Sequence, residues 1–443
     1  MNYKISNYVV FENDPISQDG VILISTRDEY QIPVRVSKDD FEKIRFADTQ
    51  FINTELFNEC TKRKILVQSD ECELEKIIEE NNSRLLEINE LSRTVMPSAN
   101  CPHGCNMIAF GNYCGQNHTN NFITESILEQ ITTEINSQLT SRKYNSFILN
   151  FFGGEPLLKP KLILSMLEKY KSFCDINGII FKSQIITSGF LAECQLIENL
   201  YKLGLTKLEL TLDGTKSYHD KRRPLKNGKG TFDTIYNNLL ALCQSSALAN
   251  LNITVRMNVD DRNEEAVLSL FDELNRDNIL SKAKFYIAHI RNWGDKESGN
   301  KYLDKEKFAA LELKLMIRAR DLGIQVQFLP YRKKILCSVV DEHSKIFDPY
   351  GNEHKCSETP LTILKKKLPD CFPNDNTWTD GWHTMLKENM VPCTSCKMLP
   401  VCGGACPKDW IQNDIPCPPF KFNFQQRLVH YFWRSNKKMD FTK

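Results

Sequence analysis

The sequence lacks two features that would indicate a nucleic-acid or membrane partner. Its 57 basic and 56 acidic residues nearly cancel, so no general electrostatic field attracts nucleic acid or an anionic membrane. No apolar run approaches the roughly 20 residues of a membrane span. The first residues, MNYKISNYVVFEND, lack the basic start and apolar core of a signal peptide. These absences predict a cytoplasmic protein with no nucleic-acid or membrane partner.

Cysteine is abundant, with 16 residues in the chain. Because the cytosol keeps thiols reduced, stable disulfides are not expected, and clustered cysteines favour metal ligation. Five isolated cysteines are instead expected to pack as small apolar or surface side chains. These are Cys60, Cys72, Cys174, Cys194 and Cys243.

Three zones differ in their sequence patterns. Residues 1–93 combine short alternating stretches with two helical patterns, which predicts a small α+β module. In residues 94–329, apolar strand-like runs alternate with amphipathic helical runs. The expected strands are 146–152, 181–189, 207–214, 252–260 and 283–290, and the expected helices are 125–139, 160–173, 194–204 and 231–244.

Strands and helices that alternate at this spacing predict parallel β/α units in an α/β fold. With a first strand just before residue 100, about six units are expected, a count that fits an incomplete barrel as readily as an open sheet. The expected fold is a partial (β/α)6 barrel. In barrels, catalytic groups lie at the C-terminal ends of the strands. Residues 330–443 show weak periodicity but hold eight of the 16 cysteines, so bound metal clusters are expected to contribute to their folding.

The segment CPHGCNMIAFGNYC places Cys101, Cys105 and Cys114 in one loop. Three thiolates leave one iron of a four-iron cluster open to a substrate. A structural zinc site is the alternative, and His103 or His118 would supply its fourth ligand.

Polar residues follow several expected strands and predict a ligand-binding rim. None of them is decisive alone, but they fall at successive strand ends, where a barrel binds its ligands. They are Glu155 in FFGGEP, Ser188 in ITSGF, Asp213, His219 and Arg223 in TLDGTKSYHDKRRP, and Arg256 and Asn258 in VRMN.

From about residue 94 onward, the sequence resembles the radical S-adenosylmethionine (SAM) superfamily. The first two cysteines keep the C-x3-C spacing of that family and Tyr113 precedes Cys114, but eight residues, rather than two, separate Cys105 from Cys114. The resemblance implies that GGEP binds the amino group of SAM through Gly153, Gly154 and Glu155. It also implies that Ser188 contacts the ribose and that Arg223 contacts the methionine carboxylate.

The resemblance also implies the chemistry. The three cysteines hold a [4Fe–4S] cluster whose open iron binds SAM. One electron then cleaves a carbon–sulfur bond, and a 5′-deoxyadenosyl radical removes a hydrogen from the substrate. The protein supplies orientation and excludes water.

The last zone resembles the SPASM domain, which carries auxiliary [4Fe–4S] clusters in radical peptide maturases. The resemblance rests on the motif CTSCKMLPVCGGAC, which is followed by one more cysteine. The resemblance implies that Cys393, Cys396, Cys402 and Cys417 hold a distal cluster, whereas Cys337, Cys356 and Cys406 hold a proximal one. The fourth proximal ligand is Cys371, or that iron is open, and the expected total is three clusters.

Enzymes of this branch modify ribosomally made peptides, and residues 1–93 have the size of a winged-helix-like module that binds a precursor peptide. The sequence therefore predicts a peptide maturase that installs a thioether or carbon–carbon crosslink, with an external one-electron donor of the flavodoxin or ferredoxin type. Three alternatives stay open. They are formylglycine formation of the sulfatase-maturase kind, a zinc-binding interaction protein, and a purely scaffolding N-terminal module.

Overall fold

The computed structural model describes residues 2–47, 54–87, 89–105, 116, 118–290, 303–332, 337–361, 385–411 and 415–439. These residues fall into two compact units. One combines residues 1–88, 305–341 and 368–443, and the other combines residues 89–304 and 342–367. Each unit therefore joins segments that are distant in the sequence.

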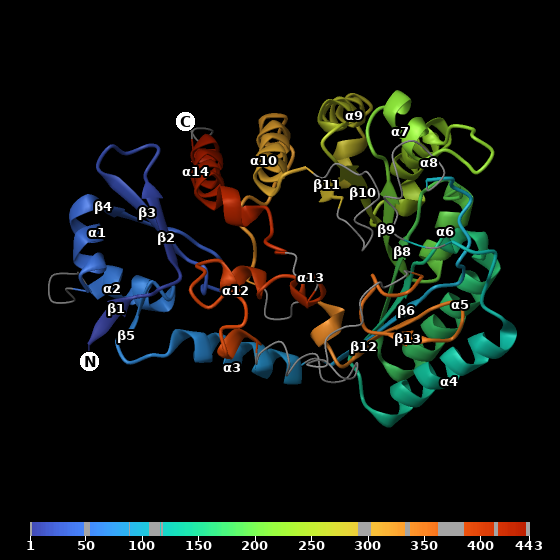
Figure 1. Cartoon of the computed structure of the whole chain (residues 1–443), viewed down its shortest axis with the longest axis horizontal. Helices are drawn as coiled ribbons and strands as arrows, with labels where there is room; N and C mark the ends of the chain where they lie inside the picture. Colours follow the sequence, from blue (N-terminus) through green and yellow to red (C-terminus); the bar gives the residue numbers. More distant parts are fainter. Residues whose placement is uncertain are drawn as a thin grey trace. The chain divides into compact units, whose positions relative to one another are not determined.

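An eight-stranded sheet organises the unit of residues 89–304 and 342–367 (Figure 1). The strands lie in the order β11-β10-β9-β8-β7-β6-β12-β13, and all neighbours from β6 to β11 pair in parallel. The predicted α/β fold with parallel strands is confirmed. The parallel strands are β6 (Glu90–Val95), β7 (Ser146–Phe151), β8 (Ile180–Ile186), β9 (Leu205–Thr211), β10 (Asn252–Val259) and β11 (Lys284–His289).

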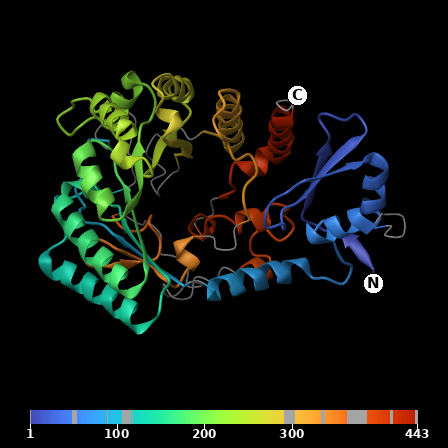
Figure 2. The ribbon, with the colours of Figure 1, turned by 180° about the vertical axis from the view of Figure 1, so that it is seen from behind.

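Helices connect these strands, and Figures 1 and 2 show α4, α5 and α6 along the outer face of the sheet. Local signals set their ends. The Thr124 side chain caps α4, and the left-handed Gly178 ends α5. The helices are α4 (Glu125–Ser141), α5 (Pro160–Asn177), α6 (Cys194–Lys202), α7 (Lys216–Arg222), α8 (Phe232–Gln244) and α9 (Glu264–Arg276), with short 3-10 turns η1 (Pro156–Leu158), η2 (Ser246–Leu248) and η3 (Ile279–Ser281).

Apolar and polar side chains alternate along the strands, so that one face of the sheet packs in the hydrophobic core and the other lines a cavity. In β7, Phe147, Leu149 and Phe151 are fully buried, and the strand packs against α5. Asn150 lies between them in sequence and lines a cavity on the other face. Because side chains alternate between the two faces of a strand, one short run of sequence supplies both the core and the cavity wall.

Two further strands come from the cysteine-rich zone, where the sequence analysis expected none. Strand β12 (Ser344–Phe347) pairs in parallel with β6, and β13 (Glu353–His354) pairs antiparallel with β12. Both are too short to show a period of two. Arg93 of β6 stabilises the junction, because its guanidinium donates to the His343 carbonyl at 2.8 Å.

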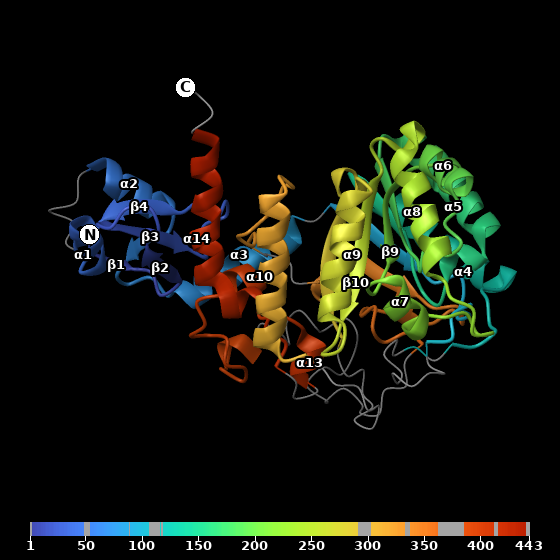
Figure 3. The same cartoon turned by 90° about the horizontal axis from the view of Figure 1, so that it is seen from above.

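The other unit contains two small antiparallel sheets. One is β2 (Val9–Asn13), β3 (Gly20–Ser25) and β4 (Val34–Ser37), and the second pairs β1 (Tyr3–Ile5) with β5 (Leu66–Gln68). Figure 3 shows α10 beside α14 in this unit. Its helices are α1 (Lys38–Arg45), α2 (Thr54–Lys62), α3 (Glu73–Leu86), α10 (Lys305–Asp321), α12 (Leu399–Cys402), α13 (Pro407–Ile411) and α14 (Phe420–Met439), with the 3-10 turn η4 (Ser338–Val340).

Strand β3 is buried at all six residues because both of its faces are covered. Val21 and Leu23 pack with the N-terminal helices. Ile22 and Ile24 pack in a second cluster that includes Val401 of α12. The α+β module of the N-terminal zone is present, and it shares a core with the C-terminal cysteine-rich segment.

None of the helices that the structure describes has the length and apolar character to cross a membrane.

Candidate active site

A cavity of about 390 Å³ opens at the C-terminal ends of the parallel strands. Inward-facing polar side chains form its wall, as the alternation of the strands requires. The strands contribute Thr94, Asn150, Gln184, Thr211, Arg256 and Asn258. The loops contribute Cys101, Cys105, Gly153, Gly154, Ser188 and Arg223, which are all residues that the sequence singled out. Cys114 lies outside the described residues.

The loop that carries the first two cysteines is fastened to the segment after α7. Gly104 N–H donates to the Pro224 carbonyl at 2.8 Å, and Lys226 N–H donates to the Pro102 carbonyl at 2.9 Å. His103 Nδ1 lies 3.2 Å from the Arg223 carbonyl, so this nitrogen carries the proton and donates it. These contacts bring Cys101, Cys105 and Arg223 to one cavity although more than a hundred residues separate them.

His103 is buried and does not line the cavity. Burial, together with the charge of Arg223, lowers the pKa of His103 to about 3, so the ring is neutral. Within the described ranges, no three His, Cys, Asp or Glu side chains lie close enough together to hold a single metal ion. The described residues therefore give no support to the alternative zinc site with His103 or His118.

The turn after β7 requires glycine because its backbone lies close to the backbone of residues 98–100. A Cβ on Gly154 would lie 2.3 Å from the Asn100 carbonyl oxygen. The backbone also pairs here, since Gly154 N–H donates to Ser98 at 2.9 Å and Glu155 N–H donates to Asn100 at 2.8 Å. The two glycines therefore hold the start of the cysteine loop against the end of β7.

Glu155 is fully buried and is not among the residues that line the cavity. Its Oε1 accepts from Thr187 Oγ1 at 2.6 Å and from Leu157 N–H at 3.1 Å. Its Oε2 accepts from Ser188 N–H at 2.9 Å and from Ser188 Oγ at 2.5 Å. The carboxylate thus connects the turn after β7 to the turn after β8.

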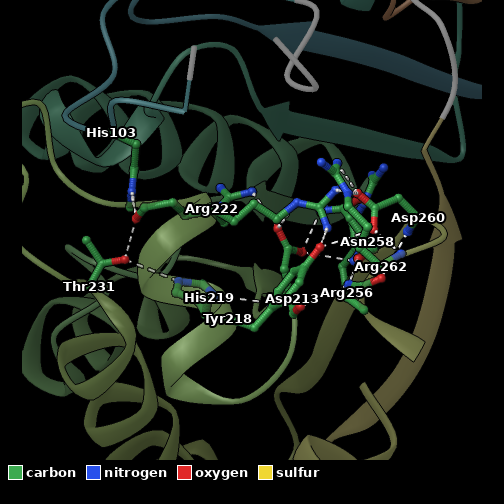
Figure 4. Close-up of polar contacts among 12 residues, drawn as sticks. His103, Asp213, Tyr218, His219, Arg222, Thr231, Arg256, Asn258, Asp260 and Arg262 are labelled. Carbon is green, nitrogen blue, oxygen red and sulfur yellow. Dashed lines mark hydrogen bonds and ion pairs between the residues drawn. The ribbon is translucent and has the colours of Figure 1, made fainter. Parts of the chain in front are cut away.

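Asp213 follows β9 and is completely buried, with Asn258 and His219 as neighbours (Figure 4). Guanidinium nitrogens of Arg222 and Arg223 lie 3.7 Å from its Oδ2. Burial alone would raise the pKa of Asp213, but the charges of Arg223 and Arg222 lower it, so it is a carboxylate. Its ion pair with Arg223 holds that guanidinium beside the cavity.

His219 extends this network away from the cavity. Its Nδ1 accepts from the Asp213 N–H at 3.1 Å, and its Nε2 donates to Thr231 Oγ1 at 3.2 Å. Thr231 Oγ1 in turn donates to the Arg223 carbonyl at 2.7 Å, the carbonyl that His103 also contacts (Figure 4). Burial lowers the pKa of His219 to about 3, so the ring is a neutral structural link.

Arg256 and Asn258 lie on the same face of β10, as their spacing predicted, and both line the cavity. Arg256 Nε donates to Asn258 Oδ1 at 2.9 Å, which fixes the guanidinium. Sequence reasoning did not single out Thr94, Asn150, Thr187 or His289, which line the same cavity. The available signal was a polar residue among apolar ones near the end of an expected strand.

Comparison with known families decides what this cavity belongs to. The model of the radical SAM superfamily matches residues 95–274, the stretch that contains the cysteine loop, the glycine turn and Arg223. The chain contains a radical SAM domain.

Proteins with the same fold have been solved. One is anSMEcpe with bound AdoMet and the Cp18Cys peptide, 16% identical, with a TM-score of 0.56 over 78% of this chain and 99% of that one. Histidine-tagged anSMEcpe with bound AdoMet, also 16% identical, gives a TM-score of 0.57 over 78% of this chain and 96% of that one. In sequence, this chain is 25% identical to Fe-coproporphyrin III synthase of Methanosarcina barkeri over 299 residues, 59% of this chain and 71% of that protein.

Beyond the radical SAM domain, four cysteines line a second cavity of about 140 Å³, in the unit that holds the N-terminal sheets. These are Cys393, Cys396, Cys402 and Cys417. Burial, followed by the charges of Cys402, Cys396 and Cys417, raises the pKa of Cys393 to about 12. Four thiols are the soft donors that an iron–sulfur cluster takes, although within the described residues no three of them lie close enough together to hold a single metal ion.

Two hydrogen-bond donors contact sulfur atoms of these four cysteines. Gly404 N–H donates to Cys402 Sγ at 3.3 Å, and Lys421 Nζ donates to Cys417 Sγ at 3.2 Å. The proximal set that the sequence predicted is divided, since Cys337 and Cys406 belong to one unit and Cys356 to the other. Cys371 lies outside the described residues.

Proposed function

We propose that this chain is a radical SAM enzyme that removes a hydrogen from a ribosomally made precursor peptide and installs a thioether or carbon–carbon crosslink. The observation that carries the proposal is the 390 Å³ cavity in which Cys101, Cys105, the glycine turn and Arg223 meet inside a radical SAM domain. A second cavity, lined by four cysteines among mostly apolar residues, supports the presence of at least one auxiliary cluster.

Cys101, Cys105 and Cys114 are the proposed ligands of the catalytic cluster. With three protein ligands, one iron stays available for SAM. When bound, SAM and its cluster supply one-electron carbon–sulfur cleavage and the hydrogen-abstracting radical. The unusual interval between Cys105 and Cys114 lengthens the loop without removing a ligand.

The chain's own residues bind the cofactor and position it. Arg223, held by Asp213, is the proposed partner of the methionine carboxylate, because its charge is fixed at the cavity wall. Gly153 and Gly154 present backbone groups near the proposed amino-group site, and Ser188 presents a hydroxyl for the ribose.

Cys393, Cys396, Cys402 and Cys417 are the proposed ligands of a distal auxiliary cluster. Cys337, Cys356 and Cys406, with Cys371 or an open iron, are the proposed proximal site, which makes three [4Fe–4S] clusters of the SPASM type. Crosslinking removes two hydrogens from the peptide, one as a hydrogen atom and the other as a proton and an electron. An auxiliary cluster held by these cysteines would supply an acceptor for that electron. A cytoplasmic flavodoxin or ferredoxin is the proposed source of the priming electron.

A peptide substrate is supported by the likeness in fold to anSMEcpe, which was solved with bound peptides. The N-terminal module, residues 1–93, is the proposed recognition site for the precursor. Among its described strands, β4 is an edge of its sheet, and an edge strand can pair with an extended peptide.

The test is anaerobic reaction of the reconstituted full chain with SAM, a reductant and the precursor peptide encoded beside its gene, followed by mass spectrometry. A peptide that has lost two hydrogens and contains a new crosslink is expected. An aldehyde at a Cys or Ser, detected with a hydrazide probe, would favour formylglycine formation. A chain that holds its iron but forms no 5′-deoxyadenosine would overturn the proposal.

A further inference from the structure

Between the glycine turn and the end of β8, the hydrogen bonds of the cavity wall determine which groups donate and which accept. At the centre of these hydrogen bonds is Glu155, which is fully buried and receives four of them. A carboxylate has about four lone-pair sites. Every acceptor site of Glu155 is therefore occupied by Thr187, Ser188 and Leu157.

The two hydroxyl groups bound to Glu155 lie on residues that line the cavity. Each hydroxyl has one proton and two lone pairs. Thr187 gives its proton to Oε1, and Ser188 gives its proton to Oε2. One lone pair of each is also engaged, because Thr187 Oγ1 accepts from Gly189 N–H at 3.1 Å and Ser188 Oγ accepts from Phe190 N–H at 3.4 Å.

What each hydroxyl retains is a single lone pair and no proton. A ligand group that touches either oxygen must therefore be a donor, such as a sugar hydroxyl or an ammonium. A hydrogen-bond acceptor of the ligand placed there would face the lone pair of the hydroxyl oxygen without a proton between them. This unsatisfied contact costs free energy in a buried site.

We infer that Thr187 and Ser188 together bind donor groups of SAM, and that Glu155 is a positioning residue that acts only through these two hydroxyls. This inference rests on the proposed function and assigns Thr187, which the motif analysis did not. For Glu155 to touch an ammonium itself, one of its four hydrogen bonds would have to break.

The test is SAM affinity in anaerobically reconstituted full-length protein without reductant, measured by equilibrium dialysis so that no turnover occurs. In Glu155→Gln, the amide NH₂ faces either the Leu157 or the Ser188 N–H, so a hydroxyl must turn its proton toward the cavity. We expect affinity to fall about tenfold. Glu168→Gln, the same change at an exposed position of α5, is the matched control and should bind as the wild type does.

A double-mutant cycle separates the indirect role from direct contact. The pair Thr187→Val and Ser188→Ala removes both hydroxyls, and adding Glu155→Gln to that background should cost less than about twofold. A loss as large as in the wild-type background would overturn the inference, because Glu155 would then contact SAM itself. An unchanged affinity of Glu155→Gln in otherwise wild-type protein would overturn it as well.

Thr187 provides a second route that does not depend on folding of the Glu155 variants. Thr187→Ser keeps the hydroxyl and should retain affinity, whereas the isosteric Thr187→Val should lose about tenfold. Equal affinities for these two variants would remove Thr187 from the site. Wild-type protein with full iron that binds no SAM would instead end the proposed function, and the inference with it.

Discussion

At the scale of single residues, the cysteine loop and Arg223 act as one structure. His103 and Thr231 both donate to the Arg223 carbonyl, while Asp213 holds the Arg223 guanidinium. Neutral histidines suit this task because they stay uncharged in a buried network near a cationic group.

The cysteine ligands give the most direct prediction at this scale. Cys101→Ala, Cys105→Ala and Cys114→Ala should each abolish 5′-deoxyadenosine formation, because a cluster with two ligands cannot be held with an open iron for SAM. Auxiliary iron should remain in all three. Chromatography of the nucleoside products, with iron analysis, checks this. Cys194→Ala, at a half-buried cysteine of α6, should stay active, and full cleavage by Cys114→Ala would show that its ligand role is wrong.

Gly154 gives a prediction on stability. In Gly154→Ala the new Cβ would collide with the Asn100 carbonyl, so the unfolding free energy should fall by about 1–3 kcal/mol. Denaturant unfolding measures the change. Gly178→Asn is the control, because nothing lies within 4 Å of its Cβ position and asparagine tolerates its left-handed backbone. If the two variants lost the same stability, the close approach of the chain would not be the reason for the glycine.

The sequence located the site better than it described it. Motifs in the sequence assigned Gly153, Gly154, Ser188 and Arg223 to one site, and in the structure all four line the same cavity. It could not show that Glu155 turns away from that cavity, because this depends on hydroxyl groups of a neighbouring strand end, more than thirty residues later.

At the scale of elements, the parallel strands were predictable because they are apolar, regular and separated by amphipathic helices. Strand β12 was not, since its four residues carry no periodic pattern and it forms only by pairing with β6. Arg93 connects the two strands and also makes a double ion pair with Glu134 of α4, at 2.9 and 2.8 Å.

Breaking this pair should therefore loosen β12. Arg93→Met should lower the unfolding free energy by about 2–3 kcal/mol at neutral pH, because it removes the two hydrogen bonds to Glu134 and leaves that carboxylate with Lys345 alone. The urea midpoint measures this. Lys171→Met, which breaks an exposed pair with Asp175 on α5, should change it by less than about 1 kcal/mol. Equal effects would contradict a special role for the Arg93 pair.

The same pair predicts a pH dependence. Burial alone would raise the pKa of Glu134, but Arg93 and Lys345 bring it below its usual value. A lowered carboxyl pKa contributes stability that is present above the unfolded-state value and is lost as pH falls through the folded one. The difference between wild type and Arg93→Met should shrink below about pH 4. A difference that stays constant from pH 7 to pH 3 would contradict this.

At the scale of the whole molecule, the N-terminal module shares a hydrophobic core with the C-terminal cysteine-rich segment. The second cluster around β3 joins Ile22 and Ile24 to Met398, Val401 and Leu428, beside the four-cysteine cavity. In the sequence, more than 230 residues separate these two zones. Their joint core could not be foreseen, because hydrophobic patterning shows which face is buried but not against what.

Ile24→Ala tests this shared core. It should lower stability by about 2–5 kcal/mol and should also lower auxiliary iron, because it leaves a void behind α12. Thermal unfolding and iron analysis of the reconstituted protein measure both. Ile16→Ala, at an exposed position, should change neither, and undiminished iron in Ile24→Ala would separate the module from the metal site.

The two covered faces of β3 also set an order of events during synthesis. The strand leaves the ribosome early, but most partners of its second face lie in residues 398–432, and among the later buried residues of this cluster only Leu329 is made before them. At 5–20 residues per second the delay is roughly 20–75 s. During that time the second face of the half-finished sheet stays largely uncovered, and the cavity lined by the four distal cysteines is complete only after nearly the whole chain has been translated.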